Sequence, residues 1–451
     1  MLRKLLILLV MLCAGLSMAQ ELPAVVAVYQ DANGAVMVSH DGEALTLIES
    51  VPEGANVKAS ISPDAAFVVV MVDQVHLNRF DYPAEWEGQM IGNLGLMNRL
   101  YVFNLESGEV VLERETLLND YAMDYFYVSG AVYATLLDGN VGASWSPDSS
   151  RVAWIEDTAE SEFGHLVMFN VADGSLTELD ATGGVPYDLQ WSPDSQFVIY
   201  RAINNFGTGA GYSSTGAYIV LPDNTTHALS LPQTERTSKD INAYGWLTNT
   251  QFVFSMFSPF AGASGLFVYD AADDSLLTLV EADVELLYSG IDIQPESGQI
   301  VVTVSDLSGD DVMGTYLYRS ITSEPELIYN QDADVAVFLT PNLIYLYQYD
   351  REAPFYGIYH IDTGELVPQE NLSGSVSASS HGVMFNQGMM IQLDGTQIQV
   401  PGVYAEYIHW LSEDVFVSFH DGSPDIHMVN ISGEIQTLTL PDSKILDVKG
   451  Q

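Results

Sequence analysis

The residues best suited to molecular recognition are aromatic and acidic, and they gather in long stretches between short apolar segments. The candidate binding residues are Trp86, Asp120, Tyr121, Asp124, Tyr125, Tyr127 and Tyr212. Tryptophan and tyrosine combine a large apolar ring with one polar group, so they supply wide contact area at small entropic cost. These residues therefore predict a binding surface. In the alternative interpretation, the rings pack on one another and close the top of a central channel.

Residue patterns typical of catalysis are not found in the sequence. The segment Gly262-Ala263-Ser264-Gly265 lacks the Gly-x-Ser-x-Gly spacing of a serine nucleophile. The nine histidines have neither His-x-x-x-His nor His-Glu-x-x-His spacing, so a zinc enzyme is not indicated. No catalytic residue is assigned. In an enzyme, carboxylates such as Asp120 and Asp124 would be the first to consider.

Calcium is the one metal that the acidic residues leave open, because it binds oxygen ligands alone. Aspartates cluster in two connections, Asp270, Asp273 and Asp274 in one, and Asp306, Asp310 and Asp311 in the other. Neither cluster has the spacing of an EF-hand calcium loop. We therefore assign no metal ligand and no cofactor, with calcium as the alternative.

The elements that must position these residues are short strands in a repeated order. The motif Trp145-Ser146-Pro147-Asp148-Ser149 returns 46 residues later as Trp191-Ser192-Pro193-Asp194-Ser195. Weaker copies begin at Ile61 and Ile293, and more degraded ones at Trp246, Phe338 and Trp410. In each copy an apolar strand runs into a turn and then into a second apolar strand. Proline presets the turn geometry, and the Asp or Ser side chain can bond the backbone beyond it.

A second hairpin follows each of these strand pairs, with turns such as Glu106-Ser107-Gly108 and Asp362-Thr363-Gly364. Each repeat of roughly 40 to 50 residues thus supplies four antiparallel strands, here called a, b, c and d. Four strands per repeat is the blade of a β-propeller. The sequence therefore predicts an all-β fold made of a single β-propeller.

The turn motif resembles that of the WD40-like, TolB-like β-propeller repeats, whose hallmark is Trp-Ser-Pro-Asp-Gly between the first two strands. The resemblance is close at residues 145–149 and 191–195 and extends by pattern over nearly all of the chain. This sequence departs from the family in having Ser149 and Ser195 where the family has glycine. It also lacks the α/β domain that accompanies the propeller in the translocation protein TolB, so the partners of that protein are not carried over.

Eight blades are the preferred prediction, with seven and nine also open. First strands are expected near residues 58, 142, 187, 243, 289, 334, 375 and 405. Residues 25–49 indicate three further strands, and residues 444–448 can supply a fourth. Taken literally this gives nine blades, and the unit at 375–400 is the one we doubt. We expect the two ends of the chain to pair and close the ring.

The long connections are predicted to lie on one face of the propeller. Turns from a to b and from c to d share one face, and connections from b to c and from d to the next a share the other. The long stretches 81–98, 117–141, 203–216 and 232–242 all belong to the second face. Long loops without secondary structure are usually functional or mobile. The predicted binding surface therefore lies on this face.

The first residues carry the features of a secretory signal peptide. Arg3 and Lys4 precede an apolar run over residues 5–16, and Ser17-Met18-Ala19 places small residues at the two positions that are read for cleavage. We expect cleavage after Ala19, a propeller domain over residues 20–451, and a secreted or periplasmic protein. No later stretch is apolar over the length that a membrane helix requires, so we expect no membrane span.

The composition is strongly acidic, with 60 acidic and 14 basic residues and a formal net charge of −46. Such a charge excludes nucleic acid as a partner. We therefore expect an exported binding or scaffolding protein that recognises a protein, peptide or glycan through the face with the long connections. The alternative is a hydrolase or lyase that acts on polysaccharide or peptide with carboxylates in the central cleft.

Overall fold

The computed structural model describes the chain from residue 24 to residue 450, with gaps. The described ranges are 24–40, 43–52, 55–73, 97–117, 143–156, 165–180, 185–207, 211–232, 239–258, 262–282, 286–306, 314–331, 333–349, 353–370, 372, 376–386, 388–400, 402–403, 408–419, 423–441 and 443–450. Every regular element within these ranges is a β-strand. None of the described residues forms a helix of the length and apolar character needed to cross a membrane.

The strands form nine four-stranded antiparallel sheets, numbered here as blades in ring order. Blade 1 contains β1 (Val25–Asp31), β2 (Val36–His40), β3 (Glu43–Ile48) and β36 (Ser443–Gly450). Blade 2 contains β4 (Asn56–Ile61), β5 (Phe67–Asp73), β6 (Met97–Asn104) and β7 (Val110–Leu117). Blade 3 contains β8 (Ser144–Trp145), β9 (Arg151–Glu156), β10 (His165–Asn170) and β11 (Leu176–Asp180).

The next three blades continue the same order of strands. Blade 4 contains β12 (Val185–Trp191), β13 (Val198–Gly207), β14 (Gly211–Val220) and β15 (Thr226–Ala228). Blade 5 contains β16 (Ile241–Trp246), β17 (Gln251–Ser258), β18 (Gly262–Asp270) and β19 (Ser275–Val280). Blade 6 contains β20 (Leu286–Gln294), β21 (Gln299–Asp306), β22 (Gly314–Tyr318) and β23 (Glu326–Tyr329).

The last three blades complete the ring. Blade 7 contains β24 (Val335–Thr340), β25 (Leu343–Gln348), β26 (Phe355–His360) and β27 (Glu365–Pro368). Blade 8 contains β28 (Ser377–Ala378), β29 (Val383–Asn386), β30 (Met389–Gln392) and β31 (Gln397–Gln399). Blade 9 contains β32 (Ile408–Trp410), β33 (Val415–Phe419), β34 (Asp425–Asn430) and β35 (Ile435–Thr439).

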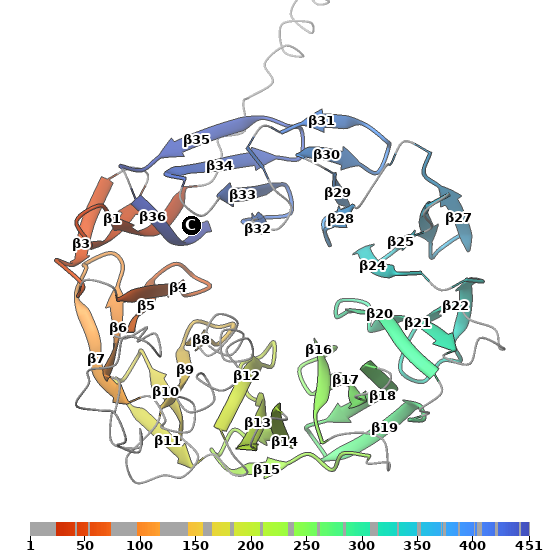
Figure 1. Cartoon of the computed structure of the whole chain (residues 1–451), viewed down its shortest axis with the longest axis horizontal. Coiled ribbons are helices and arrows are strands. Elements are labelled where there is room, and N and C mark those ends of the chain that lie inside the picture. Colours follow the sequence, from red (N-terminus) through yellow and green to blue (C-terminus); the bar gives the residue numbers. More distant parts are fainter. Residues whose placement is uncertain are drawn as a thin grey trace, which may run out of the picture.

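The sheets stand around a ring with one end strand of each toward its centre, β36 in blade 1 and the first strand of the chain order in every other blade (Figure 1). The prediction of a β-propeller with four-stranded blades is confirmed. The number of blades is nine, at the upper end of the predicted range, so the preferred count of eight is wrong. The doubted unit at 375–400 is blade 8. Its first strand has only two residues, Ser377 and Ala378, which explains why the sequence pattern there is weak.

The two ends of the described chain close the ring, as predicted. Strand β36 pairs antiparallel with β1 from Val25 opposite Gly450 to Asp31 opposite Ser443. Blade 1 is thus made of three strands from the beginning of the chain and one from its end. With β36 in place, blade 1 has four strands like the other blades. The ring is then closed, and each blade packs between two neighbours, which protects the edges of the sheets.

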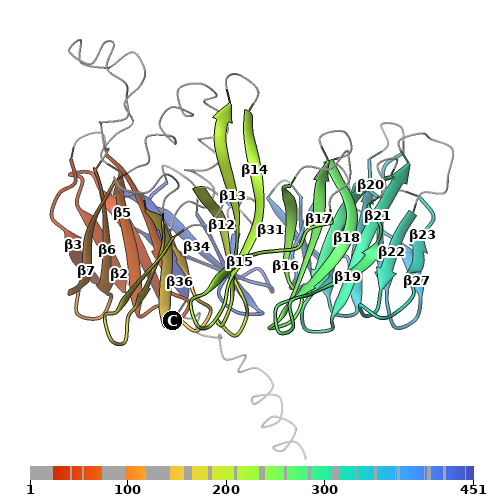
Figure 2. The same ribbon diagram turned by 90° about the horizontal axis from the view of Figure 1, so that it is seen from below.

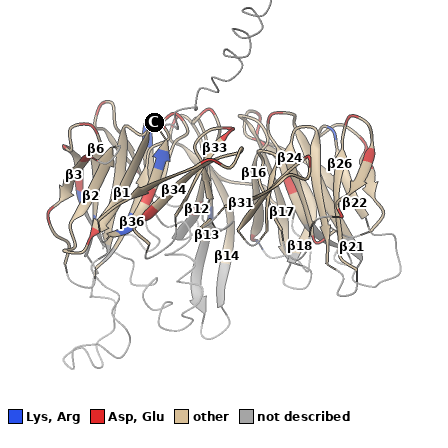
Figure 3. Cartoon of the chain, turned by 90° about the horizontal axis from the view of Figure 1, so that it is seen from above, with Lys and Arg blue, Asp and Glu red and all other residues tan. Residues whose placement is uncertain are grey.

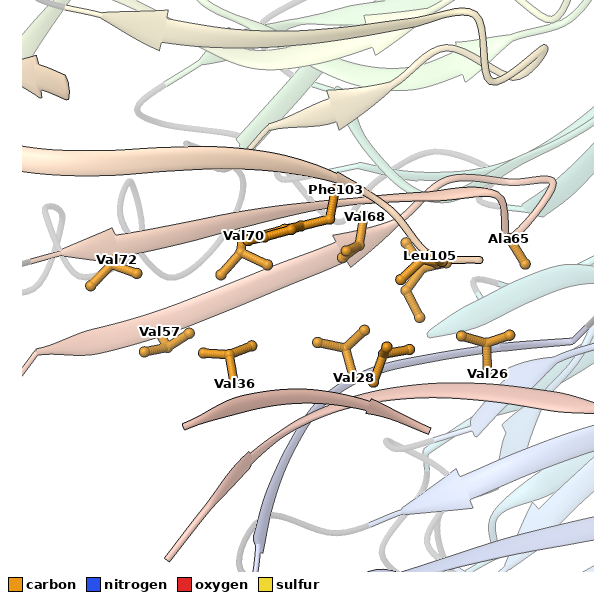
Figure 4. Close-up of a cluster of buried hydrophobic side chains, with 12 residues drawn as sticks. Val26, Val28, Val36, Val57, Ala65, Val68, Val70, Val72, Phe103 and Leu105 are labelled. Atoms are coloured by element: carbon orange, nitrogen blue, oxygen red, sulfur yellow. The ribbon is translucent and has the colours of Figure 1, made fainter. Parts of the chain in front are cut away.

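Neighbouring blades pack face to face through alternating apolar side chains. In blade 1, Val26 and Val28 face blade 2, where they meet Val68 and Val70 in one buried cluster (Figure 4). Residues between them, such as Ala27, face blade 9 in another cluster. Both faces of each sheet are buried in this way, so the second strands are nearly continuous apolar runs.

The Ser-Pro-Asp turns connect adjacent blades as well as adjacent strands. Ser149 and Ser195, which replace the glycine of the resembling family, are buried and have a positive φ of 62°. The Ser149 hydroxyl accepts a hydrogen bond of 3.0 Å from the backbone N–H of Asp64 in blade 2. The Ser195 hydroxyl accepts one of 3.1 Å from the backbone N–H of Asp148 in blade 3. Serine at this strained position therefore joins the turn of one blade to that of the blade before it.

The inner strands are linked in two further ways. At the ends of β8, β12 and β16, the indole N–H of a tryptophan donates to a backbone carbonyl of the preceding blade. Trp145 bonds Ser60 at 2.8 Å, and Trp191 bonds Ser144 at 3.1 Å.

At two junctions without that tryptophan, a carboxylate makes the link instead. Asp292 of β20 accepts the backbone N–H of Phe338 in β24 at 2.8 Å. Asp447 of β36 accepts the backbone N–H of Ile61 in β4 at 2.7 Å. Burial raises the pKa of both carboxyls above the ordinary value of 3.8, against the lowering effect of these hydrogen bonds.

Two substitutions of Ser195 distinguish the stability that its hydrogen bond contributes from the cost of its strained backbone. Ser195→Ala keeps a Cβ at positive φ and leaves the Asp148 N–H without its acceptor, so we expect a loss of about 1 to 3 kcal/mol in the free energy of unfolding. Ser195→Gly loses the same bond but removes the strain, and it should recover about 1 kcal/mol. Urea denaturation of both variants measures the difference. An alanine variant as stable as the glycine variant would contradict this account.

Asp447 should make the protein more stable at mildly acidic pH. Because its folded pKa is raised, the folded chain holds a proton that the unfolded chain has released. The stability contributed by this group is fully present below 3.8 and is lost as the pH rises through the folded pKa. Asp447→Asn lacks this titration, so its stability should vary less with pH across that interval. Urea denaturation between pH values of about 4 and 8 tests this, and parallel curves for the two proteins would refute it.

Candidate functional site

The two faces of the ring differ in the connections that they carry. In blades 2 to 9 the inner strand runs into a short turn on one side of the ring, here called the turn face, and the connections from b to c emerge on the other side, the loop face (Figure 2). Strands β13 and β14 extend beyond the other strands on the loop face (Figure 2). The structure thus agrees with the predicted division of connections between faces.

The sequence-predicted binding residues fall almost entirely outside the described part of the chain. These residues are Trp86, Asp120, Tyr121, Asp124, Tyr125 and Tyr127. Tyr212 lies in β14, one residue after the Gly207–Gly211 pair at the tip of the long hairpin. Its place in the hairpin puts it at the loop face, and the binding surface built on these residues stays a prediction.

A charged network lies at the base of the β13–β14 hairpin. The Arg201 Nε atom is 3.0 Å from Asp188 Oδ2, and Arg201 Nη1 is 3.5 Å from Asp240 Oδ1. Arg201 Nη1 also donates to the Ile241 carbonyl at 2.9 Å. Asp240 is only 5% exposed, and Asp188 sits at a bulge of β12 with a positive φ of 54°. One guanidinium therefore ties the second strand of blade 4 to the first strands of blades 4 and 5.

An exposed tyrosine beside an exposed aspartate lies at the loop-face end of blade 7. Tyr349, just after β25, is 61% exposed, and its backbone N–H donates to the Asp334 carboxylate. Two residues before it, the buried ring of Tyr347 stacks on that of Tyr356, with centroids 5.1 Å apart. Burial, followed by the proximity of Tyr356, Asp334 and Tyr349, raises the pKa of Tyr347. Asp334, Tyr347, Tyr349 and Tyr356 are called the Tyr349 patch below.

A second aromatic pair lies at the same end of blade 7, on the side that faces blade 6. The rings of Tyr329 and Phe355 stack nearly parallel, with centroids 4.9 Å apart and an interplanar angle of 12°. The Tyr329 hydroxyl is 2.7 Å from Gln348 Oε1 and 3.0 Å from Gln331 Oε1. Aromatic side chains thus lie on both sides of this end of blade 7, and the two glutamine amides lie on the side of blade 6.

The Tyr349 patch was missed in the sequence because its residues read as an ordinary strand. Tyr345, Tyr347 and Tyr349 alternate at every second position, which places them on one face of a strand. That alternation was the available signal. It did not reveal that the strand ends at Gln348, and this ending is what leaves Tyr349 exposed beyond the sheet.

A small cavity opens on the loop face between blades 1 and 2. Its volume is about 290 Å³, and it is lined by Ile48, Ser50, Val51, Pro52, Val72, Arg99 and Tyr101. Val72 and Arg99 flank the connection from β5 to β6, which contains the predicted residue Trp86. This cavity, lined by both apolar and polar groups and by one cation, is therefore adjacent in sequence to one of the predicted recognition segments.

The structure gives the calcium alternative no support among the residues it describes. Asp270 accepts hydrogen bonds from the backbone of Ala272 and the side chain of Gln251, and Asp274 accepts one from Tyr269. These carboxylates are therefore bonded to groups of their own turn and of the strands beside it. Within the described ranges, no group of three acidic or histidine side chains is arranged to hold a metal ion. In the other cluster, Asp306 ends β21, and Asp310 and Asp311 lie outside the described residues.

The described carboxyls with a raised pKa do not form a catalytic pair. They are Asp292 and Asp447, and each accepts a backbone N–H from the next blade. Catalytic acids need a raised pKa together with access to substrate. Burial at the blade junctions, where both carboxyls bond the backbone, explains their raised pKa without a catalytic role.

Comparison with known proteins identifies the fold and no family. No protein-family model and no curated protein matches this chain. The crystal structure of a eukaryotic initiation factor is similar with a TM-score of 0.52 and 10% sequence identity, over 94% of this chain and 97% of that chain. The crystal structure of Porphyromonas gingivalis dipeptidyl peptidase 4 has a TM-score of 0.49 and 9% identity, over 91% of this chain and 57% of that one. At 10% identity, the likeness to the initiation factor shows the fold alone.

Replacement of Arg201 should loosen the base of the long hairpin. Arg201→Met leaves Asp188 and Asp240 without their shared cation, so we expect a loss of about 1 to 3 kcal/mol in the free energy of unfolding. Arg201→Lys restores the charge without the two-ended guanidinium, and it should fall between the wild type and the methionine variant. Urea denaturation measures the order of the three proteins. A lysine variant no more stable than the methionine variant would show that the charge itself has no role.

Proposed function

We propose that this protein is an exported β-propeller that binds or scaffolds a protein, peptide or glycan through its loop face. The observation that carries the proposal is the difference between the two faces. The turn face is built from short turns bonded to one another across blades, as Ser149 and Ser195 illustrate. The loop face carries the long hairpin and the exposed Tyr349, and the aromatic segments of the sequence are predicted to lie there as well. Exposed aromatic residues on a rigid scaffold are typical of recognition surfaces.

Two finer assignments belong to the same proposal. The blades with the Trp-Ser-Pro-Asp turn are proposed to be repeats of the WD40-like, TolB-like type, which rests on residues 145–149 and 191–195. Export to the periplasm or the medium is proposed from the charged start and apolar run of residues 1–19. A strongly acidic chain is well suited to remain dispersed in those compartments, because its charge opposes association.

Affinity capture from periplasmic and culture fractions tests this function. The exported chain should have the mass of residues 20–451. A variant with Tyr121, Tyr125 and Tyr127 changed to serine should lose the partner that the wild-type protein retains, because the aromatic contact area is removed at unchanged net charge. Bound species are identified by mass spectrometry.

A matched control removes exposed apolar area elsewhere. Val110, Leu176 and Leu277 are exposed side chains on the outer strands, and their change to serine also leaves the charge unchanged. This control should retain the partner. If both variants bind it equally, or if only the control loses it, the loop face is not the binding surface.

A further inference from the structure

We infer that the Tyr349 patch binds arginine side chains of a basic segment in the partner. The inference rests on the proposed function, because it assigns a partner chemistry to the loop face. It starts from the exposure of Tyr349, which at 61% is the most exposed of the large apolar side chains in the described part of the chain. A ring of this size left in water has a free energy cost that contact with a ligand would remove.

The backbone of Tyr349 is held in place before any ligand arrives. Its N–H donates to the Asp334 carboxylate, and two residues earlier in β25 the ring of Tyr347 stacks on that of Tyr356 in the paired strand β26. Tyr347 and Tyr356 are buried in the core of blades 7 and 8, so the strand end that precedes Tyr349 is fixed. A backbone fixed in advance loses little entropy on binding.

The charge around Tyr349 favours a cation. Asp334 is exposed, and its Oδ1 atom accepts no hydrogen bond from the described residues. Glu370, at the loop-face end of the same blade, is exposed as well. The described ranges of blade 7, 333–349 and 353–370, contain no lysine or arginine, and the sequence between them, Asp350-Arg351-Glu352, has one basic and two acidic residues. Figure 3 shows the same imbalance over the ring as a whole, with acidic positions spread over the described ribbon and few basic ones.

Arginine fits this arrangement better than other partners do. Its planar guanidinium stacks on an aromatic face and can bond a carboxylate at its edge at the same time. The net charge of −46 attracts basic segments over long range and repels anionic glycans and acidic peptides. A neutral glycan would gain from the ring but not from Asp334 or from the field of the whole chain.

The test uses the full mature chain and a short fluorescein-labelled peptide of alternating arginine and glycine. Fluorescence anisotropy measures its affinity, alongside a citrulline peptide of the same shape without charge and a lysine peptide of the same charge. Arg351 follows Tyr349 by two residues and lies outside the described residues. The measurements are therefore made in the Arg351→Gln background, where this arginine does not compete.

We expect the arginine peptide to bind more tightly than the lysine peptide and the citrulline peptide to bind least. Tyr349→Ala should weaken arginine binding by roughly three- to tenfold at unchanged charge, and Tyr349→Phe should not. Asp334→Asn should weaken it more than Glu109→Gln, which removes the same charge from an exposed position on the turn face.

Equal affinities for the arginine and lysine peptides, or an unchanged affinity in Tyr349→Ala, would overturn the inference, since attraction would then come from net charge alone. Binding of a neutral oligosaccharide such as cellotetraose that Tyr349→Ala abolishes, without binding of the arginine peptide, would overturn it as well. Both results leave the proposed function standing. That function fails separately, if the captured partner is indifferent to the loop-face tyrosine substitutions.

Discussion

Face-to-face packing of neighbouring sheets is the constraint on which the rest of this structure depends. A sheet buried on both faces needs apolar side chains in both directions, and Val26 and Ala27 of β1 illustrate this by entering the clusters on opposite sides of blade 1. Such packing has no natural end until the last sheet meets the first. The pairing of β36 with β1 supplies that end, and every blade then has two neighbours.

Apolar packing fixes the neighbours, and polar groups fix how they sit against each other. The links run through tryptophan N–H groups at some junctions, as at Trp145, and through buried carboxylates at others, as at Asp292 and Asp447. The two devices differ in their response to pH, because only the carboxylate titrates. Junctions made by Asp292 and Asp447 are therefore sensitive to acidity, whereas those made by tryptophan are not.

The same architecture explains why recognition is assigned to one face. The turn face is committed to contacts between blades, since its serine hydroxyls and turn amides bond one another. On the loop face, links between blades such as that of Arg201 lie at the base of the connections, so insertions beyond them do not disturb the propeller. The exposed Tyr349 and the network of Arg201 at the base of the β13–β14 hairpin are two ways in which blades use that freedom.

The sequence by itself determined the elements that depend on nearby residues. Trp145 and Trp191 mark blade starts, the glycine turns mark hairpins, and residues 444–448 indicate the closing strand, because strand alternation and turn chemistry act over a few residues. The tertiary structure alone decided the count of nine, since the two-residue β28 has almost no pattern of its own. It also decided the role of Ser149, whose partner Asp64 is 85 residues away, and the exposure of Tyr349. Such features depend on which blades become neighbours and where each strand ends, and the local pattern does not contain that information.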